Sequence, residues 1–134
     1  MIDTGDYDFS FSGLKTAVLR HMKRESAAGR DVDLADLAAS FQEAIVDVQV
    51  SKTIAAAKEH GVKAVLLGGG VVANTRLRER MEKAGAEAGI GVLFPSLELC
   101  TDNAAMIAVA GASRLARGER SPFDVAADPA LELA

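Results

Sequence analysis

The sequence is poor in cysteine, tryptophan and long apolar runs, and each shortage excludes a class of protein. It has one cysteine, Cys100, so no disulfide can form within the chain, which fits a reducing compartment such as the cytosol. No apolar run approaches the roughly 20 residues that cross a bilayer, and the first residues lack a signal-peptide pattern. With a net charge of −4, the chain is not a wholly basic nucleic-acid module, although a local basic patch remains compatible with it.

The composition otherwise describes an ordinary soluble domain. The 134 residues are 49 % apolar and 25 % charged, which predicts one folded domain rather than a disordered chain. With five phenylalanines, one tyrosine and no tryptophan, the core must be helix-rich with small residues at close contacts. A chain of this size is expected to bury roughly two-thirds of its unfolded surface.

The first half of the chain has helical periodicity. A short entry and a helix are predicted over residues 9–22, followed by a polar linker over 23–32. Asp33 is a suitable N-cap for a stronger helix that ends at Gly61, as one helix or as two with a break near Ser51.

The period changes after this helix. Val62–Leu67 and Val92–Phe94 are short apolar runs typical of buried parallel strands, and a helix follows each of them. The expected fold class is α/β, helix-rich with a small parallel sheet of two or three strands. Its three parts are a helical segment over 9–60, a β-α-β-α ligand-binding core over 62–120, and a tail over 121–134.

Three consecutive glycines follow the first predicted strand, in the stretch VLLGGGVVAN over residues 65–74. Glycines let a ligand approach the backbone, and the carboxyl ends of parallel strands are where α/β folds bind ligands. The alternative is a tight turn without a ligand. Because no Gly-Lys-Ser or Gly-Lys-Thr follows, a P-loop is excluded. Gly68, Gly70 and Ala73 fit the looser dinucleotide-binding pattern G-x-G-x-x-A. However, the Asp or Glu that would hydrogen-bond the ribose of a dinucleotide is missing after the second strand.

A second candidate site follows the second strand, in CTDNAAM over residues 100–106. Asp102 and Asn103 are both good N-cap residues, so Asp102 is either the cap of the last helix or a ligand for a metal ion. His21 and His60 lack a second histidine at helical spacing, so the chain has no self-contained histidine metal site.

Three motifs together resemble a known family. DFSFSGLKTAV (8–18), LLGGGVVANTRLRERM (66–81) and CTDNAAMIA (100–108) are similar, in order and spacing, to motifs of the TsaD family, formerly called glycoproteases. The resemblance implies part of a two-lobed actin-like, sugar-kinase-like ATPase fold. It also implies transfer of a threonylcarbamoyl group from threonylcarbamoyl-adenylate to a tRNA adenosine, with tRNA, TsaB-like and TsaE-like proteins as partners in the cytoplasm.

The resemblance also assigns roles to residues. It implies that Gly69 and Gly70 line the pocket for threonylcarbamoyl-adenylate or an ATP-type nucleotide, that Asn74 contacts this ligand, and that Asp102 binds one divalent metal, iron or zinc. The family's paired-histidine motif, which supplies the other metal ligands, has no counterpart in this chain. The chain therefore resembles the C-terminal part of the family, with no complete catalytic site, and is expected to be inactive alone.

Two other functions stay open at this point: a stand-alone nucleotide-binding module without catalysis, and a Rossmann-type dinucleotide-binding domain. The helix predicted over 74–86 also places Arg76, Arg78 and Arg80 outward. These arginines, with Lys15, are either a local patch for tRNA phosphates or an ordinary solvated helix face.

Overall fold

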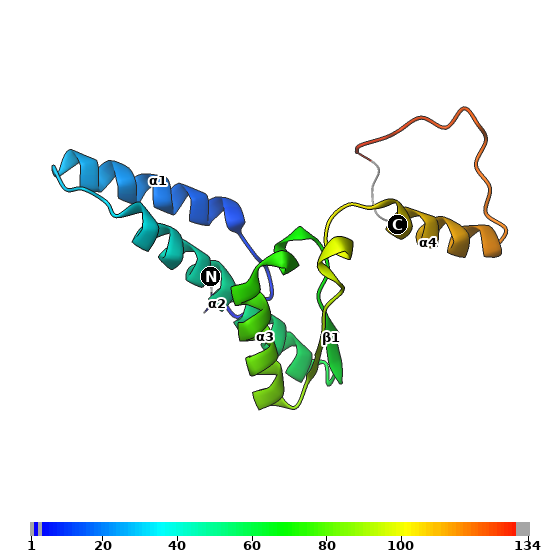
Figure 1. The fold of residues 1–134 in the computed structure, drawn as a ribbon, viewed down its shortest axis with the longest axis horizontal. Helices are drawn as coiled ribbons and strands as arrows, with labels where there is room; N and C mark the ends of the chain where they lie inside the picture. Colours follow the sequence, from blue (N-terminus) through cyan, green and yellow to red (C-terminus); the bar gives the residue numbers. More distant parts are fainter. Residues whose placement is uncertain (1, 3, 131–134) are drawn as a thin grey trace.

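A computed structural model of the protein describes residues 2 and 4–130, so the end of the predicted tail, 131–134, lies outside the described residues. Over this range the chain forms four α-helices and two strands, and Figure 1 shows how the ribbon connects them. The order is α1 (Phe11–Ala27), α2 (Leu34–Glu59), β1 (Ala64–Leu66), the 3₁₀ turn η1 (Gly70–Ala73), α3 (Thr75–Ala88), β2 (Gly91–Leu93), the 3₁₀ turn η2 (Leu97–Leu99) and α4 (Ala104–Ala116).

The two N-terminal helices begin at side-chain caps. Ser10 Oγ accepts a hydrogen bond from the backbone N–H of Gly13, and the Asp33 carboxylate accepts bonds from two N–H groups at the start of α2. The linker predicted from residue 23 is wrong over 23–27, because no glycine or proline interrupts α1 between residue 22 and Gly29, whose φ is +66°. Helix α2 is one continuous helix through Ser51.

The two strands pair in parallel, as predicted, with Ala64 opposite Gly91 and Leu66 opposite Leu93. The prediction that they are buried is wrong, because Leu66 is 74 % and Leu93 57 % exposed. The inner residues of the strands, Val65 and Val92, are half-buried. Among the described residues, the sheet is therefore covered on one face and exposed on the other.

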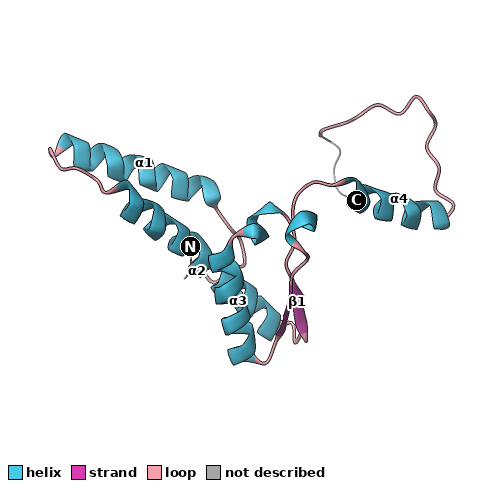
Figure 2. Ribbon diagram, viewed as in Figure 1, coloured by secondary structure: helices cyan, strands magenta, loops and turns pink. Residues whose placement is uncertain are grey.

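The core lies between α2 and α3, which cross beside the sheet (Figure 2). It consists of five buried side chains, three from α2 and two from α3: Val46, Val50, Ile54, Leu77 and Met81. The accessible surface is 10188 Å², against about 6,700 Å² for a compact protein of this mass. The chain thus buries about half of its unfolded surface, less than the two-thirds expected.

Helix α4 projects away from this core, and Figure 1 shows it beyond the yellow connection. It has no buried residue, and Met106, Ile107 and Val109 are each more than half exposed. The helix-rich α/β class with a small parallel sheet is confirmed. Among the described residues, no helix is both long and apolar enough to span a bilayer.

Gly85 marks the point where α3 lies closest to β2. A Cβ at this position would lie 2.4 Å from Val92 Cγ2 and 2.8 Å from the carbonyl oxygen of Ile90. We expect Gly85→Ala to lower the free energy of unfolding by about 1–3 kcal/mol, because the clash exceeds the gain in helix propensity. Urea denaturation followed by circular dichroism measures this change.

Gly111 in α4 is the matched control, because a Cβ there would meet nothing within 4 Å. Gly111→Ala is expected to leave stability unchanged or raise it by up to about 1 kcal/mol. Equal effects of the two substitutions would contradict the close packing of α3 on β2.

Candidate functional site

Two loops leave the same edge of the sheet. The glycine loop follows β1, and the segment Phe94–Cys100 follows β2. The strands are parallel and remain hydrogen-bonded to their carboxyl ends, where Leu67 N donates to Leu93 O at 3.0 Å. Both sequence-predicted regions, one with Asn74 and one with Asp102, therefore start from the edge at which open parallel sheets bind ligands.

The three glycines of the loop are not equivalent. Gly69 has a φ of +86°, a conformation that strains other residues, so its turn needs glycine. Gly68 and Gly70 have no such requirement, and a Cβ at either would meet nothing within 4 Å. Their side-chain directions open into empty space, which leaves the backbone accessible to an approaching group. The tight turn alone explains Gly69 but not its two neighbours.

Asn74 joins the end of this loop to α3. Its Oδ1 accepts a hydrogen bond from Leu77 N at 3.1 Å, which caps the helix, and its Nδ2 donates to Gln42 Oε1 at 3.1 Å. These bonds use one of two amide N–H groups and one of two lone pairs. The side chain is held at a fixed position and keeps the capacity for a further donor and acceptor bond.

Asp102 is exposed and is not the cap of α4. Asn103 is the N-cap instead: its Oδ1 accepts from Met106 N at 3.0 Å, and its Nδ2 donates to Thr101 O at 2.9 Å. This result removes the capping explanation for Asp102. Within residues 2 and 4–130, no group of three or more His, Cys, Asp and Glu side chains could hold a metal ion. The described part of the chain thus offers single carboxylates and not a metal centre.

The three arginines predicted to face outward are half-buried, and each makes contacts within the chain. Arg76 and Arg80 both bind Glu43 of α2, and Arg80 Nη2 also contacts Asp47 Oδ1 at 2.7 Å. The hydrogen bond from Arg76 lowers the pKa of Glu43. Arg76 and Arg80 thus form ion pairs with carboxylates of α2 while staying partly exposed, and the tRNA patch stays a prediction.

Lys52 anchors the N-terminal segment to α2 and was not anticipated from the sequence. It is 4 % exposed, and its Nζ donates to Thr4 Oγ1, Asp6 Oδ1 and Asp8 O at 2.7–3.0 Å. The hydrogen bond from Lys52 is the largest cause of the lowered pKa of Asp6. The sequence did carry a signal for this contact: Lys52 lies on the apolar face of a helix, where a buried ammonium group requires a polar partner.

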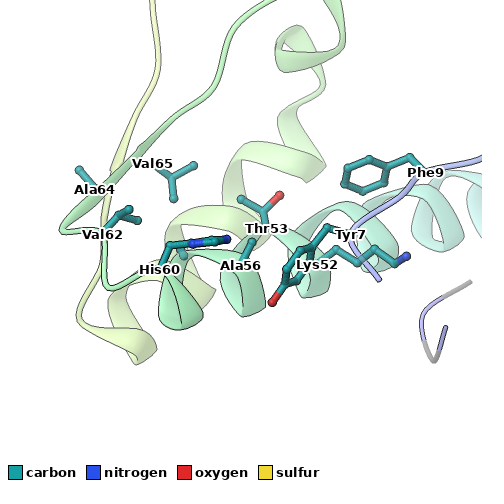
Figure 3. Close-up of a pocket in the computed structure, with 10 residues that line it drawn as sticks. Tyr7, Phe9, Lys52, Thr53, Ala56, His60, Val62, Ala64 and Val65 are labelled. Carbon is teal, nitrogen blue, oxygen red and sulfur yellow. The ribbon is translucent and has the colours of Figure 1, made fainter. Parts of the chain in front are cut away.

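The structure has a hollow of about 370 Å³ between the N-terminal segment, α2 and β1. Figure 3 shows Tyr7 and Phe9 on one side of it and Val62, Ala64 and Val65 on the other. Its lining is mainly apolar, and it contains none of the residues predicted from the sequence to bind a ligand.

A smaller cavity of about 200 Å³ lies beside the glycine loop. Phe9, Gly68 and Gln49 are among its lining residues. Gln49 Oε1 is buried, and within the described part of the chain it has no hydrogen-bond partner. A buried acceptor without a donor is costly, so Gln49 is a strained point beside the glycine loop.

Comparison with known proteins gives the family. The model of "TsaD: tRNA N6-adenosine threonylcarbamoyltransferase" matches residues 1–109. The chain belongs to the TsaD family. The TsaD fold is actin-like, so the helices and the small parallel sheet are a part of that ATPase fold. The family match also decides against the Rossmann-type interpretation of the glycine pattern.

Three relatives named tRNA N6-adenosine threonylcarbamoyltransferase illustrate the similarity. The protein of Bacillus subtilis (strain 168) is 50 % identical over 133 residues, which are 98 % of this chain and 38 % of the relative. The Kosmotoga olearia protein is 47 % identical over 131 residues, with the same two shares. The Thiobacillus denitrificans protein is 48 % identical over 139 residues, 100 % of this chain and 40 % of the relative. The chain thus spans about two-fifths of the length of these relatives.

Proposed function

We propose that this chain forms part of a tRNA N6-adenosine threonylcarbamoyltransferase and supplies one side of its nucleotide pocket and one metal ligand. The observation that carries the proposal is the shared sheet edge, from which the glycine loop and the segment leading to Asp102 both start. Family membership suggests which ligands that edge binds, since the relatives are named tRNA N6-adenosine threonylcarbamoyltransferase.

Each residue has a role that suits its chemistry. The backbone at Gly69 and Gly70 lies open to threonylcarbamoyl-adenylate or an ATP-type nucleotide. Asn74 has an amide donor and an acceptor lone pair for the same ligand, beyond the bonds that hold it. In the reaction, the exocyclic amine of the tRNA adenosine attacks the carbamoyl carbon, the bond from that carbon to the phosphate oxygen breaks, AMP leaves, and the amine loses a proton to solvent.

Asp102 is proposed as one ligand of the iron or zinc ion. Its carboxylate is exposed and free of the capping role, which Asn103 takes. Since the described residues do not make a metal centre by themselves, the remaining ligands must come from other parts of the enzyme. The partners proposed with it are tRNA and the TsaB-like and TsaE-like proteins of the family.

A hybrid enzyme tests the proposal. In it, this chain replaces the matching 38 % of the Bacillus subtilis relative, and threonylcarbamoyl transfer to tRNA is assayed with that relative's partner proteins. Asn74→Ser keeps an oxygen for the helix cap but removes the amide donors, and Asp102→Asn removes only the charge. Asn74→Ser is expected to lower transfer by about tenfold to a hundredfold, the cost of losing one hydrogen bond to a charged group. Asp102→Asn is expected to lower transfer at least as much, because a neutral amide is a poorer ligand for a metal ion than a carboxylate.

The controls change the same chemical features away from the proposed pocket. Asp33→Ser alters the N-cap of α2, and Glu98→Gln removes an exposed charge from the segment that precedes Asp102. Both are expected to retain transfer within about twofold, since neither contacts the proposed ligands. Full activity of the Asn74→Ser and Asp102→Asn hybrids would refute the proposed function.

A further inference from the structure

Arg78 joins the two loops that start from the sheet edge. Its Nε donates to the carbonyl oxygen of Val72 in η1 at 2.5 Å. Its Nη2 donates to Pro95 O at 3.3 Å and lies 3.3 Å from Cys100 Sγ. The guanidinium carbon also lies 4.9 Å from the centre of the Phe94 ring. One side chain of α3 therefore contacts both the glycine loop and the segment that follows β2.

These contacts lie close to the two proposed ligand-binding residues. Val72 is two positions before Asn74, and Cys100 is two positions before Asp102. Cys100 is itself fixed, because it is 2 % exposed and its Sγ donates to Ser96 O at 3.4 Å. A displacement of either loop relative to Arg78 would change the separation between the Asn74 amide and the Asp102 carboxylate.

Arginine suits this position for a physical reason. Its guanidinium is planar, carries five N–H donors in fixed directions, and stacks on aromatic rings. It can therefore bind two carbonyl groups and contact a ring at the same time. A lysine has the same charge but a flexible stem and no planar fork, so it cannot make all of these contacts in one geometry.

We propose that Arg78 is a positioning residue for the transfer reaction, which sets the relative position of Asn74 and Asp102 without contacting the substrate. This inference rests on the proposed function. Its bonds to Val72 O and Pro95 O orient both loops from one rigid group. A misplacement of about 1 Å between reacting groups can cost on the order of a hundredfold in rate. The expected loss is therefore in turnover rather than in nucleotide affinity.

Arg80 provides a matched control on the same helix. It is also half-buried, but its guanidinium pairs with Glu43 and Asp47 of α2 instead of the loops. Arg80→Lys and Arg78→Lys both keep the positive charge and both remove a planar fork from α3. A difference between them thus reports the contacts with the loops and not a general weakening of the helix.

The experiment uses the same hybrid enzyme. We measure kcat for transfer, the Kd for ATP as the nucleotide probe, and the thermal midpoint. Arg78→Lys is expected to lower kcat by about tenfold to a hundredfold relative to Arg80→Lys, while the Kd for ATP stays within about threefold. The thermal midpoints of the two variants are expected to agree.

Asn74→Ser and Asp102→Asn in the same hybrid separate the positioning role from the proposed function. If they lower transfer while Arg78→Lys has the kcat of Arg80→Lys, the positioning role is overturned and the proposed function stands. If Arg78→Lys loses activity only in proportion to its unfolded fraction, its role is structural and the inference is also overturned. If Asn74→Ser and Asp102→Asn are fully active, the proposed function fails, and the positioning role fails with it.

Discussion

The 134-residue chain by itself is expected to transfer no threonylcarbamoyl group to tRNA and to retain far less than one iron or zinc ion after chelation and dialysis. A catalytic metal that also holds a substrate typically has three protein ligands and an open position. No group of three suitable side chains exists among the described residues, and Asp102 alone is a single exposed carboxylate. One carboxylate binds a divalent ion weakly and does not fix its geometry.

The ligand pocket gives a second reason for inactivity. Gly68 and Gly70 face open space, so in the proposed site the described residues would form one wall and leave the ligand unenclosed. An adenylate bound there would lose much of the orientation that transfer needs. Weak nucleotide binding through the loop that ends at Asn74 is still expected, since it depends on backbone and amide groups within this chain.

Elemental analysis and a tRNA modification assay check this prediction, with the hybrid enzyme as the positive control. The hybrid is expected to hold about one ion per molecule and to be active, because its other segments supply the missing ligands. One tightly held iron or zinc ion in the chain by itself, or transfer by that chain alone, would contradict the assignment of Asp102 as a partial ligand.

The parts of the fold that the sequence predicted are those set by local chemistry. Asp33 begins α2, Gly61 follows its end, and the glycines after β1 end that strand, because caps and positive φ angles depend on a few neighbouring residues. The parallel pairing followed from the order of strands and helices. These features do not require knowledge of what packs against them.

Burial was predicted less well, because it depends on distant parts of a structure. The apolar runs at the strands predicted burial on both faces, yet Leu66 and Leu93 are exposed. The same mismatch appears in α4, where apolar residues such as Ile107 lie in solvent. An apolar sequence pattern predicts that a segment is buried, but it does not say which part of the protein buries it. The described residues cover only one face of the sheet.

The candidate site shows the same division. The positions of Gly69 after β1 and of Asn74 at the start of α3 were predictable. The choice between Asp102 and Asn103 as cap was not, since both residue types cap helices well. The apolar face of α2 predicts that Lys52 needs a polar partner, but which residues Lys52 and Arg78 bind was not predictable, because a long polar side chain reaches partners far away in sequence. Arg78 binds Pro95, 17 positions on, and Lys52 binds Asp6, 46 positions back.

Met81→Ala is expected to destabilise the fold more than Gly85→Ala does. Met81 is 1 % exposed and packs in the cluster formed by α2 and α3. Truncation of a buried methionine to alanine costs about 2–5 kcal/mol, from lost burial and from the cavity left behind. Native domains are stable by only about 5–15 kcal/mol, and this chain buries less surface than a compact domain of its mass.

Urea denaturation followed by circular dichroism tests the expectation. The urea concentration at the midpoint of unfolding is expected to fall sharply in Met81→Ala, or the cooperative unfolding transition is expected to disappear. Met106→Ala is the matched control, because Met106 is 51 % exposed on α4 and should change stability by less than about 0.5 kcal/mol. Met81→Leu, which nearly conserves volume, should cost less than about 1.5 kcal/mol. If Met81→Ala were no more destabilising than Met106→Ala, the contact between α2 and α3 could not be the folding core that holds Asn74 and Arg78 in position.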